Sequence, residues 1–113
     1  NLCDDQFCVF SGDDFTNYPI LAVGGKGIIS VTANIVPEHI ASLWDTFESG
    51  DYNKARDLHY QLLELNDAMF LETKPIPVKA ALGLMGKISP EMRLPLSPMS
   101  QNNLEKLKKV MVK

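Results

Sequence analysis

The order of apolar and polar residues divides the chain into a short part with strands and a longer part with helices. Two apolar runs come first, at residues 7–10 and 27–31, and neither alternates with polar residues as a half-exposed strand does. Continuous apolar runs of this length are typical of parallel strands that are covered on both faces. We therefore expect two buried, parallel strands.

The segment between the two runs, residues 11–26, has the length of a short crossover helix. Asp13 is placed to cap the start of this helix, and Pro19 should shorten or bend it. Gly24 and Gly25 should end it. The first part of the chain therefore reads strand, helix, strand.

After residue 36 the pattern is helical. Pro37 stands where a first helical turn accepts proline, and apolar residues follow with helical spacing as far as Phe47. Gly50 should end this helix, and Asp51 should cap a second one that runs to about residue 71. Beyond it we expect a third helix that Gly86 closes, an extended connector over residues 89–100 held against the surface, and a last helix around Leu104, Leu107 and Met111.

Two strands cannot form a stable sheet by themselves, because both edges stay unpaired and little area is buried. Further strands must therefore come from an upstream part of the same gene product or from another copy of the chain.

Composition limits the classes of protein that the chain can represent. It has 113 residues, 45% hydrophobic and 22% charged, with a net charge of −3, so we expect a single small soluble domain and no basic nucleic-acid binder. No run approaches the roughly 18 apolar residues of a membrane span. Cys3 and Cys8 make at most one disulfide, and we expect reduced, buried thiols in a cytosolic protein.

The charge is unevenly distributed. Residues 1–72 carry twelve acidic and three basic side chains, a net charge of −9, and residues 73–113 carry two acidic and eight basic ones, a net charge of +6. Either the two halves neutralise each other in the fold, which we favour, or the basic half binds a partner.

Three segments are candidates for chemistry. Ser11-Gly12-Asp13-Asp14 follows the first strand, and its paired carboxylates suit either a magnesium site or, as we favour, a helix cap. A glycine-rich turn precedes the second strand, and Ser30, Thr32 and Asn34 follow at its carboxyl end, the end at which α/β barrels build active sites. The third candidate comprises the segments 74–79 and 93–96.

Together these segments resemble the dihydrodipicolinate synthase family. The resemblance is carried, in order, by SGDD at 11–14, GGxGxISVTAN at 24–34, PIPVK at 75–79 and RLPL at 93–96. The family fold is an eight-stranded (β/α)8 TIM barrel, an α/β fold, with extra C-terminal helices. The resemblance implies that residues 1–50 are the last two β/α units of the barrel and residues 51–113 the C-terminal helical extension.

The family condenses pyruvate with aspartate semialdehyde in lysine and diaminopimelate biosynthesis, through a lysine Schiff base and a threonine-tyrosine relay. The resemblance implies that these catalytic groups lie upstream, so that no catalytic residue lies in this chain and the chain alone is inactive. Lys26, Lys74 and Lys79 then have surface roles. Gly12 and Ile29 match positions that line the pyruvate pocket, and no metal or other cofactor is implied.

The resemblance also implies a cytoplasmic homo-oligomer, commonly a tetramer, in which the helix between the two strands contributes to the contact between dimers. Two alternatives stay open: a related pyruvate-dependent aldolase of the same superfamily, and a non-enzymatic helical interaction module. We expect His39 and His59 on helix surfaces and Trp44, Met69 and Met85 in the core.

Overall fold

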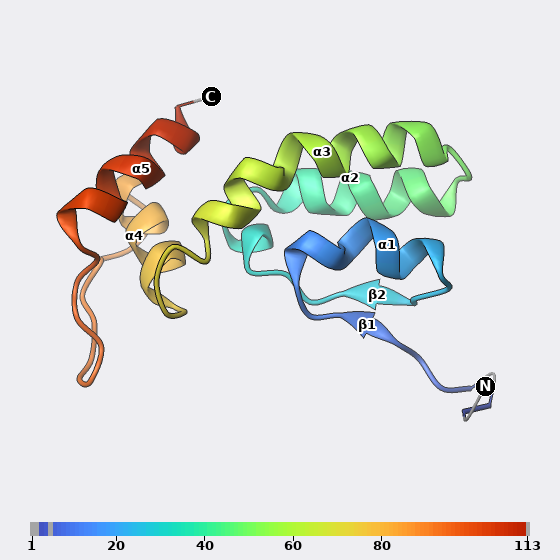
Figure 1. Cartoon of the computed structure of the whole chain (residues 1–113), viewed down its shortest axis with the longest axis horizontal. Helices are drawn as coiled ribbons and strands as arrows, with labels where there is room; N and C mark the ends of the chain where they lie inside the picture. The colour runs from blue at the N-terminus through green and yellow to red at the C-terminus, as the bar shows by residue number, and fades with distance from the viewer. Residues whose placement is uncertain (1–2, 5, 113) are drawn as a thin grey trace.

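The protein is mainly helical, with a small parallel sheet near its N-terminus (Figure 1). The computed structural model describes residues 3–4 and 6–112. Its elements are β1 (Phe10–Ser11), the 3-10 helix η1 (Asp14–Thr16), α1 (Asn17–Ala22), β2 (Gly27–Ile28), the 3-10 helix η2 (Thr32–Asn34), α2 (Pro37–Glu48), α3 (Tyr52–Ala68), α4 (Ile76–Leu84) and α5 (Gln101–Met111).

The two strands pair in parallel, as expected. Phe10 lies opposite Gly27, and the pairing is extended by hydrogen bonds from Lys26 N to Val9 O and from Ile29 N to Ser11 O, both 2.7 Å long. Each strand has only two residues, so the regular pairing is shorter than the apolar runs that predicted it.

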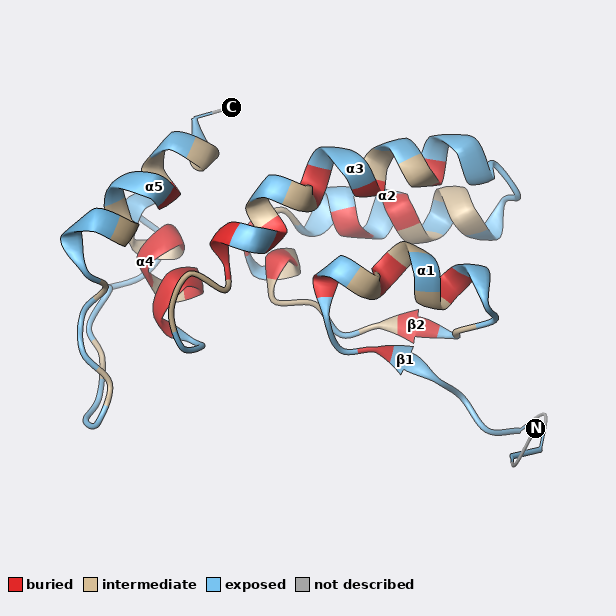
Figure 2. Cartoon of the chain, in the orientation of Figure 1, coloured by how far each residue is buried: buried red, intermediate tan, exposed pale blue. Residues whose placement is uncertain are grey.

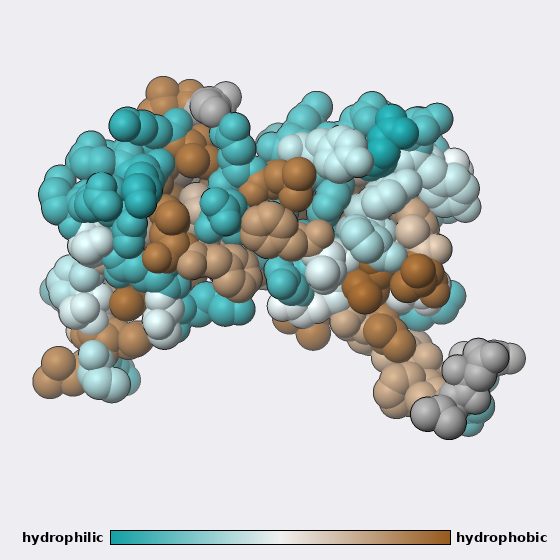
Figure 3. All heavy atoms as spheres, in the orientation of Figure 1, coloured by the Kyte–Doolittle hydropathy of each residue, from teal (hydrophilic) through white to brown (hydrophobic). Residues whose placement is uncertain are grey.

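The expectation that both faces of the sheet are buried is wrong for this chain. Helix α1 packs beside β1, between the strands and the pair of helices α2 and α3 (Figure 1). The other face is open: Phe10 is 51% exposed and Ile29 is 70% exposed, and Phe7 and Val9 are exposed as well. Apolar side chains are consequently visible on the surface at this end of the molecule (Figure 3).

The crossover between the strands follows the local signals in the sequence. Asp13 caps η1 by accepting a hydrogen bond from Phe15 N at 3.1 Å. Pro19 falls in the first turn of α1, where its missing N–H is no loss, and the helix lasts only six residues. Gly24 ends the segment with a φ of +98°, a conformation that glycine adopts without strain.

Helices α2 and α3 lie side by side and antiparallel (Figure 1). The predicted starts of both helices and the predicted end of α2 are confirmed, whereas α3 ends at Ala68, before the predicted residue 71. Pro37 is the first residue of α2, and Gly50, with a φ of +88°, follows its end. Asp51 accepts a hydrogen bond from Lys54 N at 3.1 Å and so caps α3.

The buried residues form two clusters that α3 connects (Figure 2). Leu62, in the middle of α3, packs with residues of α1 and α2, whereas Ala68 at its end packs with α4 and α5. The first cluster comprises Leu21, Ile40, Leu43 and Leu62; the second comprises Ile35, Ala68, Met69, Val78, Ala80, Ala81 and Leu107.

The connector between α4 and α5 has no regular secondary structure, as predicted. Its last residue, Ser100, is hydrogen-bonded to Glu72. One carboxylate oxygen of Glu72, Oε1, accepts hydrogen bonds from Ser100 N, Ser100 Oγ and Asn103 Nδ2 at 3.0, 2.7 and 2.9 Å. These bonds, those from Ser100 above all, lower the pKa of Glu72. Glu72 thereby holds the residue before α5 and a side chain of its first turn, at a helix start where Ser100 makes no side-chain cap.

Other expectations about burial are met only in part. Met69 is fully buried and Trp44 packs against the first cluster, but Met85 is 40% exposed because α4 ends just before it. Cys3 and Cys8 are free thiols and both are exposed rather than buried, since they precede β1 outside either cluster. Within residues 3–4 and 6–112, no helix combines the length and the apolar character that crossing a membrane requires.

We predict that Gly25→Ala destabilises the protein while Gly12→Ala does not. A β-carbon on Gly25 would lie 2.8 Å from the carbonyl oxygen of Ile20, which belongs to the backbone of α1 and cannot move aside easily. Overpacking of this kind costs about 1–3 kcal/mol. At Gly12 the same atom meets open space. Thermal unfolding of both variants measures the difference, and equal melting temperatures would contradict the close approach of residues 20 and 25.

Candidate functional site

The carboxyl ends of β1 and β2 bring Gly12 and Ile29 to the same edge of the sheet. Gly12 follows β1 directly, Ile29 follows β2 directly, and the parallel register aligns the two strand ends. Both residues are exposed. Ile29 is 70% exposed, because no described segment covers its side chain.

A buried polar network lies beside this edge. Five polar residues, one from each of β1, η1, α1, η2 and α3, are each no more than 1% exposed: Ser11, Asp14, Asn17, Thr32 and Asn66. Buried polar groups are costly unless they are hydrogen-bonded, and the bonds described next supply that pairing.

The carboxylate of Asp14 is the centre of the network. Its Oδ1 accepts a hydrogen bond from Asn17 Nδ2 at 3.0 Å. Its Oδ2 accepts two more, from the backbone N–H groups of Val31 at 2.9 Å and Thr32 at 3.0 Å. Asp14 therefore links the start of α1 to the turn after β2, where these N–H groups open η2.

Asn66 joins helix α3 to the same network. Its Nδ2 donates to the carbonyl oxygen of Asp14 at 3.2 Å, and its Oδ1 accepts from Thr32 Oγ1 at 2.8 Å. The hydroxyl oxygen of Ser11 lies 2.8 Å from both Asn17 Oδ1 and the carbonyl oxygen of Asp13, so two acceptors share its proton. The ends of both strands are thus tied to α3.

Asp13 and Asp14 have different roles. Asp13 is exposed and caps η1, as we favoured over a magnesium site. Asp14 is buried and serves backbone N–H groups, a role that the sequence analysis did not anticipate. Among the described residues there is no group of three or more His, Cys, Asp or Glu side chains that could hold a metal ion together.

The three lysines that were assigned surface roles lie away from this edge. Lys26 is exposed in the turn before β2, at the opposite end of the strand. The ammonium group of Lys74 lies 4.3 Å from the centre of the Phe70 ring, and that of Lys79 bonds the carbonyl oxygen of Glu91. The ion pairs Arg56–Asp57 and Lys108–Glu105 are both local and exposed.

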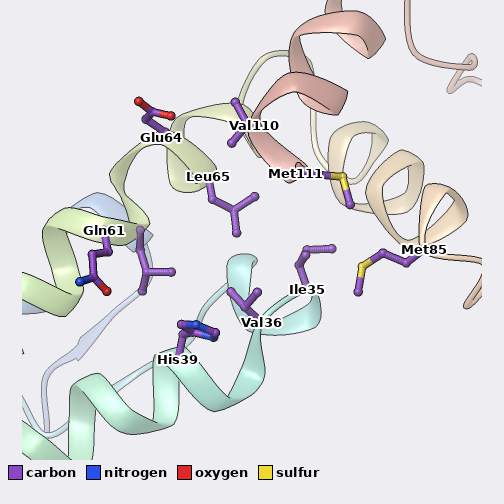
Figure 4. Close-up of a pocket in the computed structure, with 10 residues that line it drawn as sticks. Ile35, Val36, His39, Gln61, Glu64, Leu65, Met85, Val110 and Met111 are labelled. Carbon is purple, nitrogen blue, oxygen red and sulfur yellow. The ribbon is translucent and has the colours of Figure 1, made fainter. Parts of the chain in front are cut away.

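A separate groove of about 650 Å³ lies between the start of α2, the middle of α3 and the ends of α4 and α5 (Figure 4). Its walls are mainly apolar, with Leu65 and Val36 pointing into it. His39 is an exposed residue at its margin, as expected for a helix-surface histidine, and the side chain of Glu64 points away from it.

His59 does not lie on the helix surface as expected. It is 5% exposed, and its ring stacks against Tyr18 of α1 with 6.1 Å between the ring centres. Its Nδ1 has no hydrogen-bond partner among the residues that the structure describes. Burial lowers the pKa of His59 below its ordinary value of 6.5. The short helix α1 turns the face of α3 that carries His59 into an interface, which the sequence did not reveal.

The whole chain, residues 1–113, matches the Dihydrodipicolinate synthetase family. With the strand-helix-strand unit and the motifs in place, the chain belongs to this family. The 4-hydroxy-tetrahydrodipicolinate synthase of Thermodesulfovibrio yellowstonii is 61% identical over 110 residues, which cover 97% of this chain and 38% of that protein. The chain therefore spans well under half the length of such relatives.

Solved structures agree with the sequence match. Dihydrodipicolinate synthase from Thermotoga maritima superposes with a TM-score of 0.92 at 45% identity, over 95% of this chain and 36% of that one. The enzyme from Aquifex aeolicus gives a TM-score of 0.93 at 42% identity, over 96% and 37%. The resemblance seen in the motifs is confirmed.

We predict that protonation of His59 lowers the stability of the protein in mild acid. Because the folded-state pKa lies below 6.5, the unfolded chain binds the proton more readily, so the contribution of neutral His59 is complete above about pH 6.5. It is lost as the pH falls from there through the folded-state pKa. The free energy of unfolding, measured between pH 7.5 and 5, should fall less in His59→Gln than in the unaltered protein. His39→Gln is the matched control, and an equal flattening in it would refute the assignment.

Proposed function

We propose that this chain is the C-terminal part of a 4-hydroxy-tetrahydrodipicolinate synthase. The complete enzyme is a class I lyase that condenses pyruvate with L-aspartate 4-semialdehyde in lysine and diaminopimelate biosynthesis. The observation that carries the proposal is the match of the whole chain to this family, together with relatives of that name at 51–61% identity.

We propose that β1 and β2 are the last two strands of an eight-stranded barrel. Their parallel pairing and the helix between them are those of one β/α unit. The open apolar face, with Phe10 and Ile29 exposed, supports this proposal, because strands of a parallel sheet are normally covered on both faces by other parts of the protein. On this proposal residues 1–50 belong to the barrel and residues 51–113 to the helical extension.

Pyruvate binds, on this proposal, at the carboxyl end of the two strands, beside Gly12 and Ile29. A glycine without a side chain and an apolar residue both offer mainly backbone groups, which suit a small, polar keto acid. A structure of dihydrodipicolinate synthase from Acinetobacter baumannii contains pyruvate, and it matches this chain with a TM-score of 0.89 at 37% identity over 94% of this chain and 36% of that one.

The chain positions substrate and does not supply the nucleophile. A Schiff-base lysine must lose its proton inside a dry pocket, and no lysine of the described residues lies at the carboxyl end of β1 or β2. The reactive amine and its relay groups belong to the upstream strands. The chain by itself is therefore inactive.

We further propose that the complete enzyme is a cytoplasmic homo-oligomer. A structure with a TM-score of 0.91 and 45% identity is described as the first monomeric dihydrodipicolinate synthase variant, and it covers 94% of this chain and 35% of its own. That a monomeric variant is described as the first indicates that dihydrodipicolinate synthases are ordinarily oligomers.

Reductive trapping tests the proposal. Pyruvate and borohydride should give no stoichiometric adduct with the isolated chain, because solvated lysine amines are protonated at neutral pH. The same treatment of the full-length enzyme should label one lysine outside this sequence, as read by mass spectrometry of its peptides. Stoichiometric labelling of Lys26, Lys74 or Lys79 would overturn the assignment. Turnover with aspartate semialdehyde, compared with a sugar aldehyde, separates this enzyme from a related aldolase.

Two variants of Ile29 test its place at the pocket. Ile29→Pro removes the N–H that bonds Ser11 O at 2.7 Å, so we expect it to loosen the strand end and weaken pyruvate binding in the full-length enzyme. Ile29→Val shortens the side chain by one carbon, at a cost of about 0.5–1.5 kcal/mol if it is buried there, and should leave binding nearly intact. Calorimetric titration with pyruvate measures both. Normal affinity in the proline variant would remove Ile29 from the pocket.

A further inference from the structure

The two residues proposed to contact pyruvate, Gly12 and Ile29, lie close in sequence to the buried carboxylate of Asp14 and to its hydrogen-bond donors. Gly12 lies two residues before Asp14. Ile29 lies two residues before Val31, whose N–H, with that of Thr32, bonds Asp14 Oδ2. We propose that Asp14 is a positioning residue that sets the affinity for pyruvate by fixing the turn after β2 relative to the end of β1. This inference rests on the proposed function.

Few of the described hydrogen bonds join this turn to the end of β1. Regular pairing of the strands stops after two residues, and the bond from Ile29 N to Ser11 O is the last between their backbones. Within the turn, Ser30 Oγ accepts a hydrogen bond from Ala33 N at 2.8 Å, but this bond is local to it. The two bonds to Asp14 tie the turn to the other strand.

The network also holds Asp14 from the side of the helical extension. Asn66 of α3 bonds both the carbonyl oxygen of Asp14 and the hydroxyl of Thr32, so it contacts both sides of the link. The end of α3 is in turn fixed by Ala68 and Met69 in the second cluster. The helical extension therefore supports the substrate-binding edge through one amide side chain.

A carboxylate is needed at this position because all three groups that face it are donors. The side chain of Asp14 meets Asn17 Nδ2 on one oxygen and two backbone N–H groups on the other. Asparagine in its place removes the negative charge that strengthens the two bonds from the backbone N–H groups, and its NH2 is paired only if the Asn17 amide turns over to accept from it.

An exchange of the two side chains provides a rescue. In the double variant Asp14→Asn with Asn17→Asp, the amide oxygen at position 14 accepts from the two backbone N–H groups. Its NH2 then donates to the carboxylate at position 17, which still accepts from Ser11 Oγ. Every donor and acceptor of the network is then paired without any amide turning over, and the negative charge is restored only three residues away.

The experiment uses the full-length enzyme and compares the KM for pyruvate with kcat. We expect Asp14→Asn to raise KM about tenfold, equivalent to one lost net hydrogen bond to a charged group, with kcat changed much less. The double variant should return KM close to that of the unaltered enzyme. Hydrogen exchange of the Val31 and Thr32 amides, a readout independent of activity, should become about tenfold faster in Asp14→Asn and return in the double variant.

Ala55→Gly is the control for general destabilisation. Ala55 is fully buried near the start of α3, eleven residues before Asn66, so a glycine there should lower the melting temperature and leave KM unchanged. An equal rise of KM in Ala55→Gly would overturn the positioning role. An unchanged KM in Asp14→Asn, with faster amide exchange, would overturn it as well.

A milder variant covers the case in which Asp14→Asn does not fold. Asn66→Ala leaves the carboxylate in place and removes only its support from α3, so KM should rise about threefold. A normal KM in Asn66→Ala would then overturn the proposal. Failure of the proposed function is separate: the unaltered enzyme would neither bind nor consume pyruvate, whereas the amide exchange of Val31 and Thr32 would still respond to Asp14.

Discussion

The arrangement of this chain depends on one buried carboxylate. Asp14 accepts hydrogen bonds from the side chain of Asn17 and from the backbone of Val31 and Thr32, and its own carbonyl oxygen is held by Asn66. Segments that are 17 to 52 residues apart in sequence meet at this single residue. Two strands of two residues each could not establish that geometry alone.

The hydrogen bonds of this buried network determine the arrangement of the strand ends, where few apolar contacts are present. The two apolar clusters lie between α1, α2 and α3 and between α3, α4 and α5, and neither covers the outer face of the strands. Apolar contacts are non-directional, whereas a satisfied buried network permits one arrangement and penalises others. The direction of the strand ends is therefore set by hydrogen bonds.

Local signals in the sequence predicted the helices well and the site only partly. Pro37, Gly50 and Asp51 mark helix ends through their own backbone and side-chain chemistry, so they could be read without knowledge of the fold. Asp14 and Asn66 act across 52 residues, and no local pattern distinguishes them from ordinary surface residues. His59 was misplaced for the same reason: α1 covers a face of α3 that looks polar in sequence.

The buried apolar contacts and the proposed binding edge lie in different parts of this chain. The helical part brings its own buried residues, such as Leu43 and Leu107, whereas the strands leave Phe10 and Ile29 uncovered. The helices thus supply the buried contacts of this chain, and on the proposed function the strand edge becomes an enclosed pocket only with neighbouring strands. Asn66 connects the two parts, because it belongs to helix α3 and bonds residues that follow both strands. On the proposed function, helices attached in this way support the pyruvate-binding edge without contributing any group to the reaction.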